Sequence, residues 1–216
     1  MPTLVIGNKN YSSWSLRSWL VLKHLGIHFN EVRLALDTDQ FKQQIGQYSA
    51  ACRVPVLIDG TLNIWDTLAI CEYLAEDHPL LWPDNRQQRA LARAYVSEMH
   101  SGFNALRSEL PMNCRANQRQ VEISAATRAD IDRIEQIWQQ CTDAKTQHGP
   151  WLFGRFGIID AFFAPVAIRL HGYQVSLQHN SAKYIRLQLD NPLLQEWIGA
   201  GQAESEVIPD EEVGTD

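Results

Sequence analysis

The chain has 216 residues, of which 45% are hydrophobic, so it is long enough to bury a real core in one domain or in two small ones. Its net charge of −6 argues against a general nucleic-acid binder, because such proteins usually carry a basic face. No run approaches the roughly 18 consecutive apolar residues of a membrane span. No basic segment followed by an apolar one begins the chain. We therefore expect a cytoplasmic protein with neither a nucleic-acid nor a membrane partner.

The cysteines and histidines do not have the spacing of metal ligands. The four cysteines stand at positions 52, 71, 114 and 141, and no two of them form a C-x-x-C pair. This favours reduced thiols over a disulfide framework or a zinc site, and we predict no metal. Cys52 is the thiol to watch, because it directly precedes the segment Arg53-Val54-Pro55.

Strand-like and helix-like segments alternate through residues 1–78. Short apolar runs predict strands, and longer segments with apolar residues every three or four positions predict helices. The expected strands are residues 4–7, 29–34, 54–58 and 62–64, and the expected helices are residues 13–25, 40–47 and 66–76. Asp59-Gly60 is a turn signal between the last two strands. This order indicates an α/β layer with a central sheet.

A linker and a helical region follow. Two prolines and an Asp-Asn pair interrupt the pattern around residues 79–85, and residues 86–203 then predict an all-α domain. We expect a long helix over 86–108, followed by helices over 127–146, 158–170, 181–189 and 192–199. Pro165, inside the apolar helix 158–170, predicts a kink or an irregular turn. Residues 204–216 are acidic and poor in apolar residues, which predicts a frayed tail.

Residues 11–17, Tyr-Ser-Ser-Trp-Ser-Leu-Arg, lie between the first expected strand and the first expected helix. A serine there can cap the helix, because the first backbone N–H groups of a helix lack partners. Three serines within four residues exceed what capping requires. A hydroxyl at the positive end of a helix can also donate to an anion such as a thiolate. Both roles stay open on the residues alone.

A second pattern lies on the expected long helix. Met99, Phe103 and Arg107 are spaced four residues apart and share one stripe, with His100 and Asn104 on the adjacent stripe. This arrangement suits a substrate with an apolar body and an anionic group. The alternative interpretation is that Met99 and Phe103 belong to the core and that Arg107 forms an ion pair between domains.

Four parts of the chain together resemble the cytosolic glutathione S-transferase family. They are the Ser-Ser-x-Ser loop, Arg53-Val54-Pro55-Val56-Leu57, Trp65-Asp66-Thr67-Leu68-Ala69-Ile70, and Leu81-Trp82-Pro83 with Phe153-Gly154-Arg155-Phe156-Gly157-Ile158-Ile159-Asp160-Ala161. The nearest branch is the serine-using, zeta-like (maleylacetoacetate isomerase-like) one, in a bacterial-type member. The resemblance implies a thioredoxin-like N-terminal domain and an all-helical C-terminal domain, usually as a homodimer.

The resemblance also implies which residues act on the sulfur of glutathione. Ser12 is the first choice for the hydroxyl that stabilises the thiolate, Ser13 is the second and Ser15 the third. Arg17 either adds positive potential or is a surface charge. Trp14 stands where zeta-like members carry a cysteine, so the resemblance does not carry over an isomerase role of that cysteine.

The remaining glutathione contacts follow from the same resemblance. Val54, before an expected cis Pro55, would present its backbone to the cysteinyl part of glutathione. Asp66 would meet the γ-glutamyl ammonium, while Thr67 and the helix start would hold the α-carboxylate. Gln40 would contact the glycyl end.

The expected activity is that of a detoxifying glutathione transferase. The thiolate would attack a small electrophile held by the second-substrate residues Met99, Phe103, Asn104 and Arg107, and it would form a thioether or an isomerised product. Two alternatives stay open: a maleylacetoacetate-type isomerase, and a non-catalytic module of this fold that binds partner proteins. A thiol reductase is disfavoured, because the loop carries serine and Cys52 is its only nearby thiol.

Overall fold

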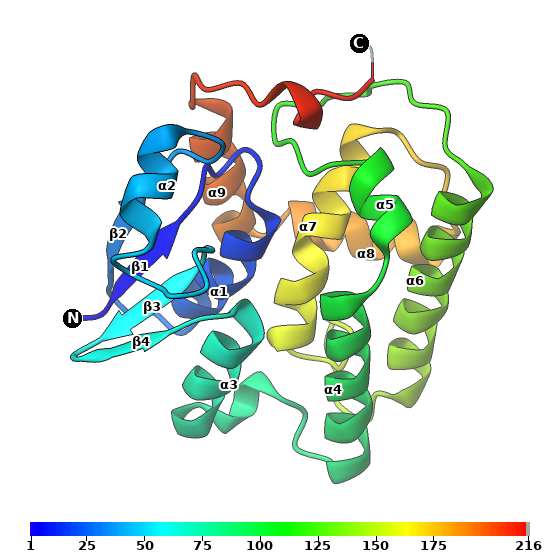
Figure 1. Cartoon of the computed structure of the whole chain (residues 1–216). Coiled ribbons are helices and arrows are strands. Elements are labelled where there is room, and N and C mark those ends of the chain that lie inside the picture. The colour runs from blue at the N-terminus through cyan, green and yellow to red at the C-terminus, as the bar shows by residue number, and fades with distance from the viewer. Residues whose placement is uncertain (215–216) are drawn as a thin grey trace.

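A computed structural model describes residues 1–214. The first half of the chain forms a four-stranded sheet with the order β2-β1-β3-β4 (Figure 1). The strands are β1 (Thr3–Ile6), β2 (Asn30–Arg33), β3 (Val56–Asp59) and β4 (Leu62–Ile64), and the helices are α1 (Ser13–His24), α2 (Asp39–Ile45) and α3 (Thr67–Asp77). β1 pairs in parallel with β2 and antiparallel with β3, and β3 pairs antiparallel with β4. This topology confirms the thioredoxin-like prediction.

The alternation of side chains along the strands divides the apolar residues between two cores. Leu4 and Ile6 of β1 belong to a large core that continues into the helical half of the chain. Val5, between them, faces a small core with Leu34 and with Ile45 of α2. The sheet therefore buries both faces, with α2 covering one side and α1 and α3 the other (Figure 1).

The second half is helical, which confirms the predicted architecture. A short 3-10 helix, η1 (Pro79–Leu81), links the halves. The helices are α4 (Arg86–Ser101), α5 (Asn104–Glu109), α6 (Ala125–Ala144), α7 (Ile158–Gly172), α8 (His179–Leu189) and α9 (Pro192–Gln202), followed by the 3-10 helix η2 (Pro209–Glu211). α7 lies at the centre and packs against α1, α4 and α8. α9 also packs against α1, so two helices of the second half, α7 and α9, contact the first helix of the sheet domain.

The start of α7 is fixed by a buried carboxylate. Asp160 accepts hydrogen bonds from the backbone N–H of Gly157 at 3.0 Å and of Leu152 at 3.3 Å, and from the hydroxyl of Tyr184 at 2.9 Å. These bonds satisfy donors that the helix start and the preceding loop would otherwise leave unpaired. Pro165, for which we expected a kink or an irregular turn, lies within a helix that is continuous from Ile158 to Gly172.

The expected long helix over residues 86–108 is wrong, because it is broken in two. α4 ends at Ser101, Gly102 is extended, and Phe103 adopts a left-handed conformation with φ of 60° before α5 begins. A β-carbon on Gly102 would lie only 2.9 Å from the carbonyl oxygen of Glu98, so glycine permits this break. The turn buries the Phe103 ring and resets the helical phase, so the four-residue stripe does not continue through Arg107.

The acidic tail also differs from expectation. Residues 204–214 are not frayed but lie across the loop before α1, and residues 215–216 of the predicted tail lie outside the described part of the chain. The Glu204 carboxylate accepts hydrogen bonds from the backbone N–H groups of Lys9 and Asn10, at 2.9 and 3.1 Å. The Tyr11 hydroxyl donates to Glu212 at 2.6 Å. Charges that looked like a solvated tail therefore have partners in the N-terminal domain.

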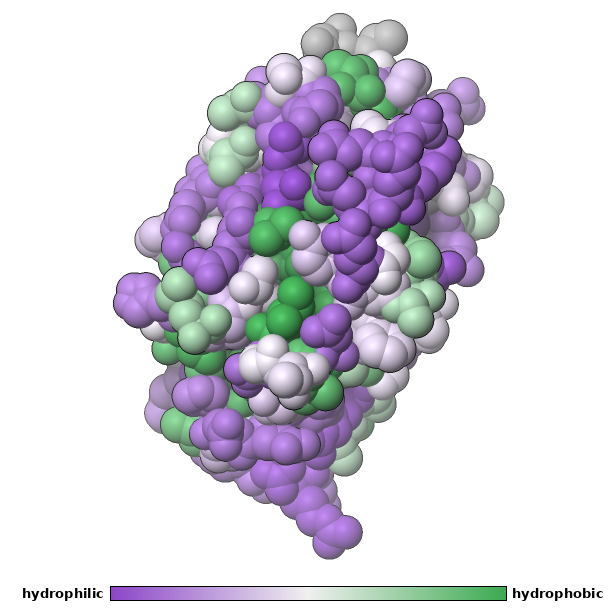
Figure 2. Space-filling model, turned by 60° about the vertical axis from the view of Figure 1, so that its left-hand side comes forward, coloured by the Kyte–Doolittle hydropathy of each residue, from purple (hydrophilic) through white to green (hydrophobic). Residues whose placement is uncertain are grey.

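The face of the molecule shown in Figure 2 is mostly polar. In Figure 2 hydrophilic residues cover most of the visible face, and a narrow band of apolar residues runs between them. Within residues 1–214 no helix combines the length and hydrophobicity that crossing a bilayer requires. The same residues contain no cluster of three or more His, Cys, Asp or Glu side chains that could hold a metal ion.

Candidate functional site

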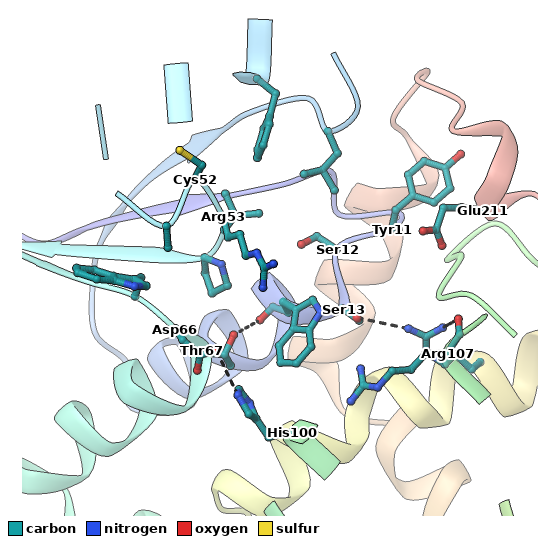
Figure 3. Close-up of a pocket in the computed structure, with 18 residues that line it drawn as sticks. Tyr11, Ser12, Ser13, Cys52, Arg53, Asp66, Thr67, His100, Arg107 and Glu211 are labelled. Atoms are coloured by element: carbon teal, nitrogen blue, oxygen red, sulfur yellow. Dashed lines mark hydrogen bonds and ion pairs between the residues drawn. The ribbon is translucent and has the colours of Figure 1, made fainter. Parts of the chain in front are cut away.

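A pocket of about 840 Å³ lies where the sheet domain meets the helical domain. Its walls come from the loop before α1, the loop before β3, the start of α3, and parts of α4, α5, α7 and η2 (Figure 3). The lining residues are Tyr11, Ser12, Ser13, Trp14, Leu36, Phe41, Ala51, Cys52, Arg53, Val54, Pro55, Trp65, Asp66, Thr67, His100, Arg107, Arg169 and Glu211.

The two serines that the sequence placed first both line this pocket, but they have different partners. Ser12 is the N-cap of α1: its oxygen accepts from the Ser15 backbone N–H at 3.4 Å, and its hydroxyl donates to the Ser15 hydroxyl oxygen at 2.7 Å. Ser13 is the first residue of α1, and its hydroxyl oxygen accepts from the Arg169 guanidinium at 3.4 Å. Ser15 is fully buried and also accepts from the Gly7 backbone N–H, so its role is structural.

The loop before β3 supplies the opposite wall. The Val54–Pro55 peptide bond is cis, as the resemblance implied, and both residues line the pocket. Cys52 lies at the same wall and is the exposed thiol of this chain, whereas Cys71, Cys114 and Cys141 are buried and free. Burial raises the pKa of those three thiols, which makes them poor nucleophiles.

The start of α3 forms the third wall. Asp66 is the N-cap of this helix, because its Oδ1 accepts from the Leu68 backbone N–H at 2.8 Å. The Thr67 hydroxyl donates to the Trp14 carbonyl at 2.9 Å, so it ties α3 to the serine loop. Since that hydroxyl proton is engaged within the protein, an anion at this helix start would meet the backbone N–H groups and the positive end of the helix instead.

The second oxygen of Asp66 faces the helical domain. It lies 3.2 Å from Nε2 of His100 on α4. Burial lowers the pKa of His100, and the nearby Arg17 and Arg107 lower it further against the opposing effect of Asp66. Nε2 of the neutral imidazole is placed to donate a hydrogen bond to this oxygen of Asp66. The sequence placed His100 only beside the expected stripe, and it gave no signal for this contact.

Three arginines gather on the inner side of the pocket; Arg17 and Arg169 are buried, and Arg107 is partly buried. Arg107 and Arg169 line it, and Arg17, which is 0% exposed, stacks its guanidinium 4.5 Å from the Trp14 ring and 4.8 Å from the Phe162 ring. The alternative that Arg17 is a surface charge is therefore wrong. Burial lowers the pKa of all three, to about 10 for Arg169, and repulsion from Arg107 adds to the shift at Arg17 and Arg169. Arg169 stays positively charged at neutral pH.

Arg107 reaches the pocket by a route that the sequence did not predict. Its Nε donates to the Gly102 carbonyl at 2.9 Å, and a second nitrogen donates to the Met99 carbonyl. These carbonyls end α4, so the guanidinium closes the break between α4 and α5. Among the described residues no carboxylate lies within 4 Å of the Arg107 guanidinium, which lines the pocket, although the charge of Asp130 opposes the lowering of its pKa.

Four predicted site residues do not line the pocket. Met99 and Phe103 are core residues, 2% and 7% exposed, as the alternative interpretation of the stripe held. Asn104 is exposed at the start of α5, and Gln40 is exposed on α2. The helix break at Gly102 explains why the predicted stripe does not line the pocket. The prediction for Gln40 depended on its spacing in the sequence alone.

Several pocket residues escaped the sequence analysis. Arg169 had a recognisable signal, because it and Asp160 are the two charged residues in the apolar segment 158–170. Glu211 had none, since it lies in the segment that we expected to be frayed. Its carboxylate is half-buried, and burial raises its pKa while the Arg169 charge opposes that shift.

Comparison with known proteins places both halves of the chain in one family. Residues 11–77 match the model "Glutathione S-transferase, N-terminal domain", and residues 88–200 match "Glutathione S-transferase, C-terminal domain". Maleylacetoacetate isomerase of Rattus norvegicus is 34% identical over 113 residues, which are 50% of this chain and 51% of the relative. The Mus musculus enzyme is 34% identical over 146 residues, 64% of this chain and 66% of the relative. The alignment with the rat enzyme therefore spans about half of the length of that relative.

Solved structures show the same fold at low identity. A glutathione transferase homologue from Burkholderia gl BGR1, with bound glutathione, superposes with a TM-score of 0.69 at 23% identity and covers 93% of this chain and 98% of its own. Ure2p in complex with glutathione superposes with a TM-score of 0.67 at 19% identity, covering 90% and 96%. With matched models over both halves and this architecture, the chain belongs to the glutathione S-transferase family.

Proposed function

We propose that this protein is a glutathione transferase that activates the thiol of glutathione for attack on a small electrophile. The observation that carries the proposal is the juxtaposition of two serine hydroxyls, a helix N-terminus and a buried arginine at one pocket wall. A thiolate is the nucleophile in such chemistry, and an unperturbed thiol has a pKa of roughly 8.5. Lowering that pKa by about two units requires about 2.7 kcal/mol of preferential thiolate stabilisation.

Glutathione would lie along the sheet-domain side of the pocket. Its cysteinyl part would pair with the backbone of Val54 in the manner of a short added strand. Its γ-glutamyl ammonium would meet the Asp66 oxygen that also faces His100, and its α-carboxylate would meet the N-terminal end of α3. Arg53 lines the pocket, whereas Gln40 does not. We therefore assign the glycyl carboxylate to the Arg53 guanidinium. The bound glutathione in the Burkholderia structure supports this choice of ligand.

The electrophile would lie on the helical-domain side, between Trp14, His100 and Arg107. The Arg107 charge favours an electrophile that carries a carboxylate, since a charge-assisted hydrogen bond is about twice as strong as a neutral one. Conjugation to a thioether is the reaction that we propose first. Cis–trans isomerisation is the second candidate, favoured by the names of the rat and mouse relatives. Trp14 in place of the cysteine of zeta-like members argues against it.

The test begins with calorimetry of glutathione binding and then measures turnover with electrophiles that do and do not carry a carboxylate. Binding in the micromolar to millimolar range together with thioether formation supports the proposal. Binding without turnover of any electrophile would favour the non-catalytic alternative, and no binding at millimolar glutathione would refute both. We also propose a cytoplasmic homodimer, as is usual for the family, which light scattering in solution and imaging of a tagged chain in cells would test.

A further inference from the structure

The hydroxyl protons of Ser12 and Ser13 are not equally available to a ligand. The Ser12 proton is donated to the Ser15 oxygen at 2.7 Å, while the Ser12 oxygen caps α1. In the described structure Ser13 only accepts, from the Arg169 guanidinium, and its hydroxyl lines the pocket. A guanidinium can only donate, so the Ser13 hydroxyl keeps its proton free for a ligand, whereas Ser15 engages the Ser12 hydroxyl through both its Oγ and its backbone N–H.

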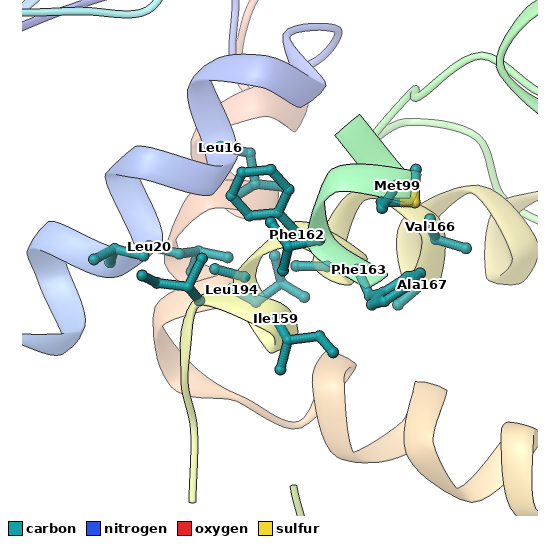
Figure 4. Close-up of a cluster of buried hydrophobic side chains, with 14 of the residues drawn as sticks. Leu16, Leu20, Met99, Ile159, Phe162, Phe163, Val166, Ala167 and Leu194 are labelled. Atoms are coloured by element: carbon teal, nitrogen blue, oxygen red, sulfur yellow. The ribbon is translucent and has the colours of Figure 1, made fainter. Parts of the chain in front are cut away.

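Arg169 is placed to act on Ser13 across the domain boundary. It belongs to α7, whose other side chains form the apolar core between α1, α4 and α9 (Figure 4). Its guanidinium donates to the backbone carbonyls of Leu110 and, at 3.4 Å, Arg107, in addition to Ser13. None of these hydrogen-bond partners is a carboxylate.

Four charged or titratable groups face Arg169: Arg17 from α1, Arg107 from α5, Glu211 from η2 and Tyr173 at the end of α7. Glu211 lines the same pocket, but no hydrogen bond or ion pair joins it to Arg169 in the described structure. A buried cation that donates to a hydroxyl oxygen polarises the O–H bond and strengthens the hydrogen bond that this hydroxyl gives in turn. The pair thus provides both direction and positive potential for an anion.

We propose that the Ser13 hydroxyl donates the hydrogen bond that holds the glutathione thiolate, and that Arg169 is a positioning residue that orients and polarises this hydroxyl. The proposal rests on the proposed function, and it reverses the order in which the sequence ranked the two serines. In the activating step the S–H bond breaks, the electron pair stays on sulfur, and the proton leaves to water in the open pocket. Ser13 keeps its own proton throughout.

The test compares four variants with the wild type. Ser13→Ala should lower kcat by about 100-fold, as expected for removal of one donor to a developing anion. Ser12→Ala should lower the midpoint of unfolding, because it removes a helix cap, and should lower kcat much less than Ser13→Ala does. Arg169→Met should raise the apparent pKa of the bound thiol by about one unit, a tenfold loss of thiolate at lower pH. Arg169→Lys should restore part of that shift.

The decisive readout is the pH profile of kcat/KM with a neutral electrophile, together with the ultraviolet absorbance of the bound thiolate. Arg186→Met, on the exposed side of α8, is the matched control for loss of an arginine and should leave both unchanged. An unshifted pH profile in a folded, glutathione-binding Arg169→Met variant would overturn the role of Arg169. Full activity of Ser13→Ala with loss in Ser12→Ala would overturn the role of Ser13, even if Arg169→Met does not fold. A wild type that binds no glutathione would instead refute the proposed function itself.

Discussion

Replacing Asp66 separates two roles that this carboxylate combines in the structure. One oxygen caps α3 through the Leu68 backbone N–H, and the other faces His100 and the pocket. In Asp66→Asn the amide oxygen can still cap the helix, since asparagine and aspartate are equally good at this position. The negative charge that would meet the γ-glutamyl ammonium is lost. Asp66→Ala loses both.

The exposure of the Asp66 side chain sets how much binding energy the loss of its charge should cost. A hydrogen bond to a charged group contributes about 1.5–3 kcal/mol when buried. The Asp66 side chain is 46% exposed, so solvent screening reduces this to about 1–2 kcal/mol. We therefore expect Asp66→Asn to weaken the Kd for glutathione about 5- to 30-fold with a free energy of unfolding within about 0.5 kcal/mol of wild type. Asp66→Ala should weaken binding similarly and should also destabilise the fold by about 1 kcal/mol.

Calorimetry with two ligands isolates the contact. The first is glutathione, and the second is an analogue whose γ-glutamyl amino group is acetylated and so carries no positive charge. If Asp66 meets the ammonium, Asp66→Asn should weaken glutathione binding but leave binding of the analogue nearly unchanged. An equal loss for both ligands would show that Asp66 acts only through the shape of the α3 start, and the reasoning above would be refuted.

Three further predictions concern the electrophile, the C-terminal segment 204–214 and the buried core. Arg107→Met should raise KM about 10-fold for a carboxylate-bearing electrophile relative to a neutral one, because it removes a charge-assisted contact; steady-state kinetics with the matched pair would check this, and equal changes would contradict it. Glu212→Gln should speed amide hydrogen exchange at Ile208 about 10-fold, because Glu212 holds Tyr11, whose oxygen accepts from that N–H; unchanged exchange would disprove the linkage. Asp160→Asn should lower the free energy of unfolding by about 2–4 kcal/mol at pH 5, because an amide nitrogen cannot accept the hydrogen bond from the Gly157 backbone N–H that an oxygen of the carboxyl group accepts. Burial raises the pKa of Asp160 to about 7, above its unfolded value, so this contribution is complete at low pH and is lost as pH rises through 7; the gap between wild type and variant in urea unfolding should therefore narrow from pH 5 to pH 8.

Local chemistry made the sheet domain predictable. Short apolar runs, the Asp59-Gly60 turn and the hydroxyl-rich helix start each act within a few residues, and the strands and helices of the first domain lie close to where those signals place them. The cis bond at Val54–Pro55 followed from the family motif rather than from the pattern. What the local signals could not give was the partner of each site residue.

The errors share a physical cause, which is long-range contact. The acidic tail is poor in apolar residues, yet Glu204 and Glu212 are held by groups about 90 to 200 positions earlier. Gly102 breaks the expected long helix because burial of the Phe103 ring in the core outweighs the helical periodicity around it. Helix propensity is a weak prior, and tertiary packing overrides it at such positions.

The site itself depends on how the two domains dock. Ser13 and Asp66 both belong to the sheet domain, but the groups that face them, Arg169 and His100, lie on α7 and α4. Ser13 and Arg169 are 156 positions apart in the chain, so their contact exists only when α7 is packed against α1. The apolar packing of α7 therefore does more than stabilise the fold: it sets the position of a buried charge relative to the thiol site. A core substitution in α7 that shifts its packing by a fraction of an ångström should accordingly alter thiol activation before it alters glutathione affinity, because the glutathione contacts that we propose for Val54 and Arg53 lie wholly within the sheet domain.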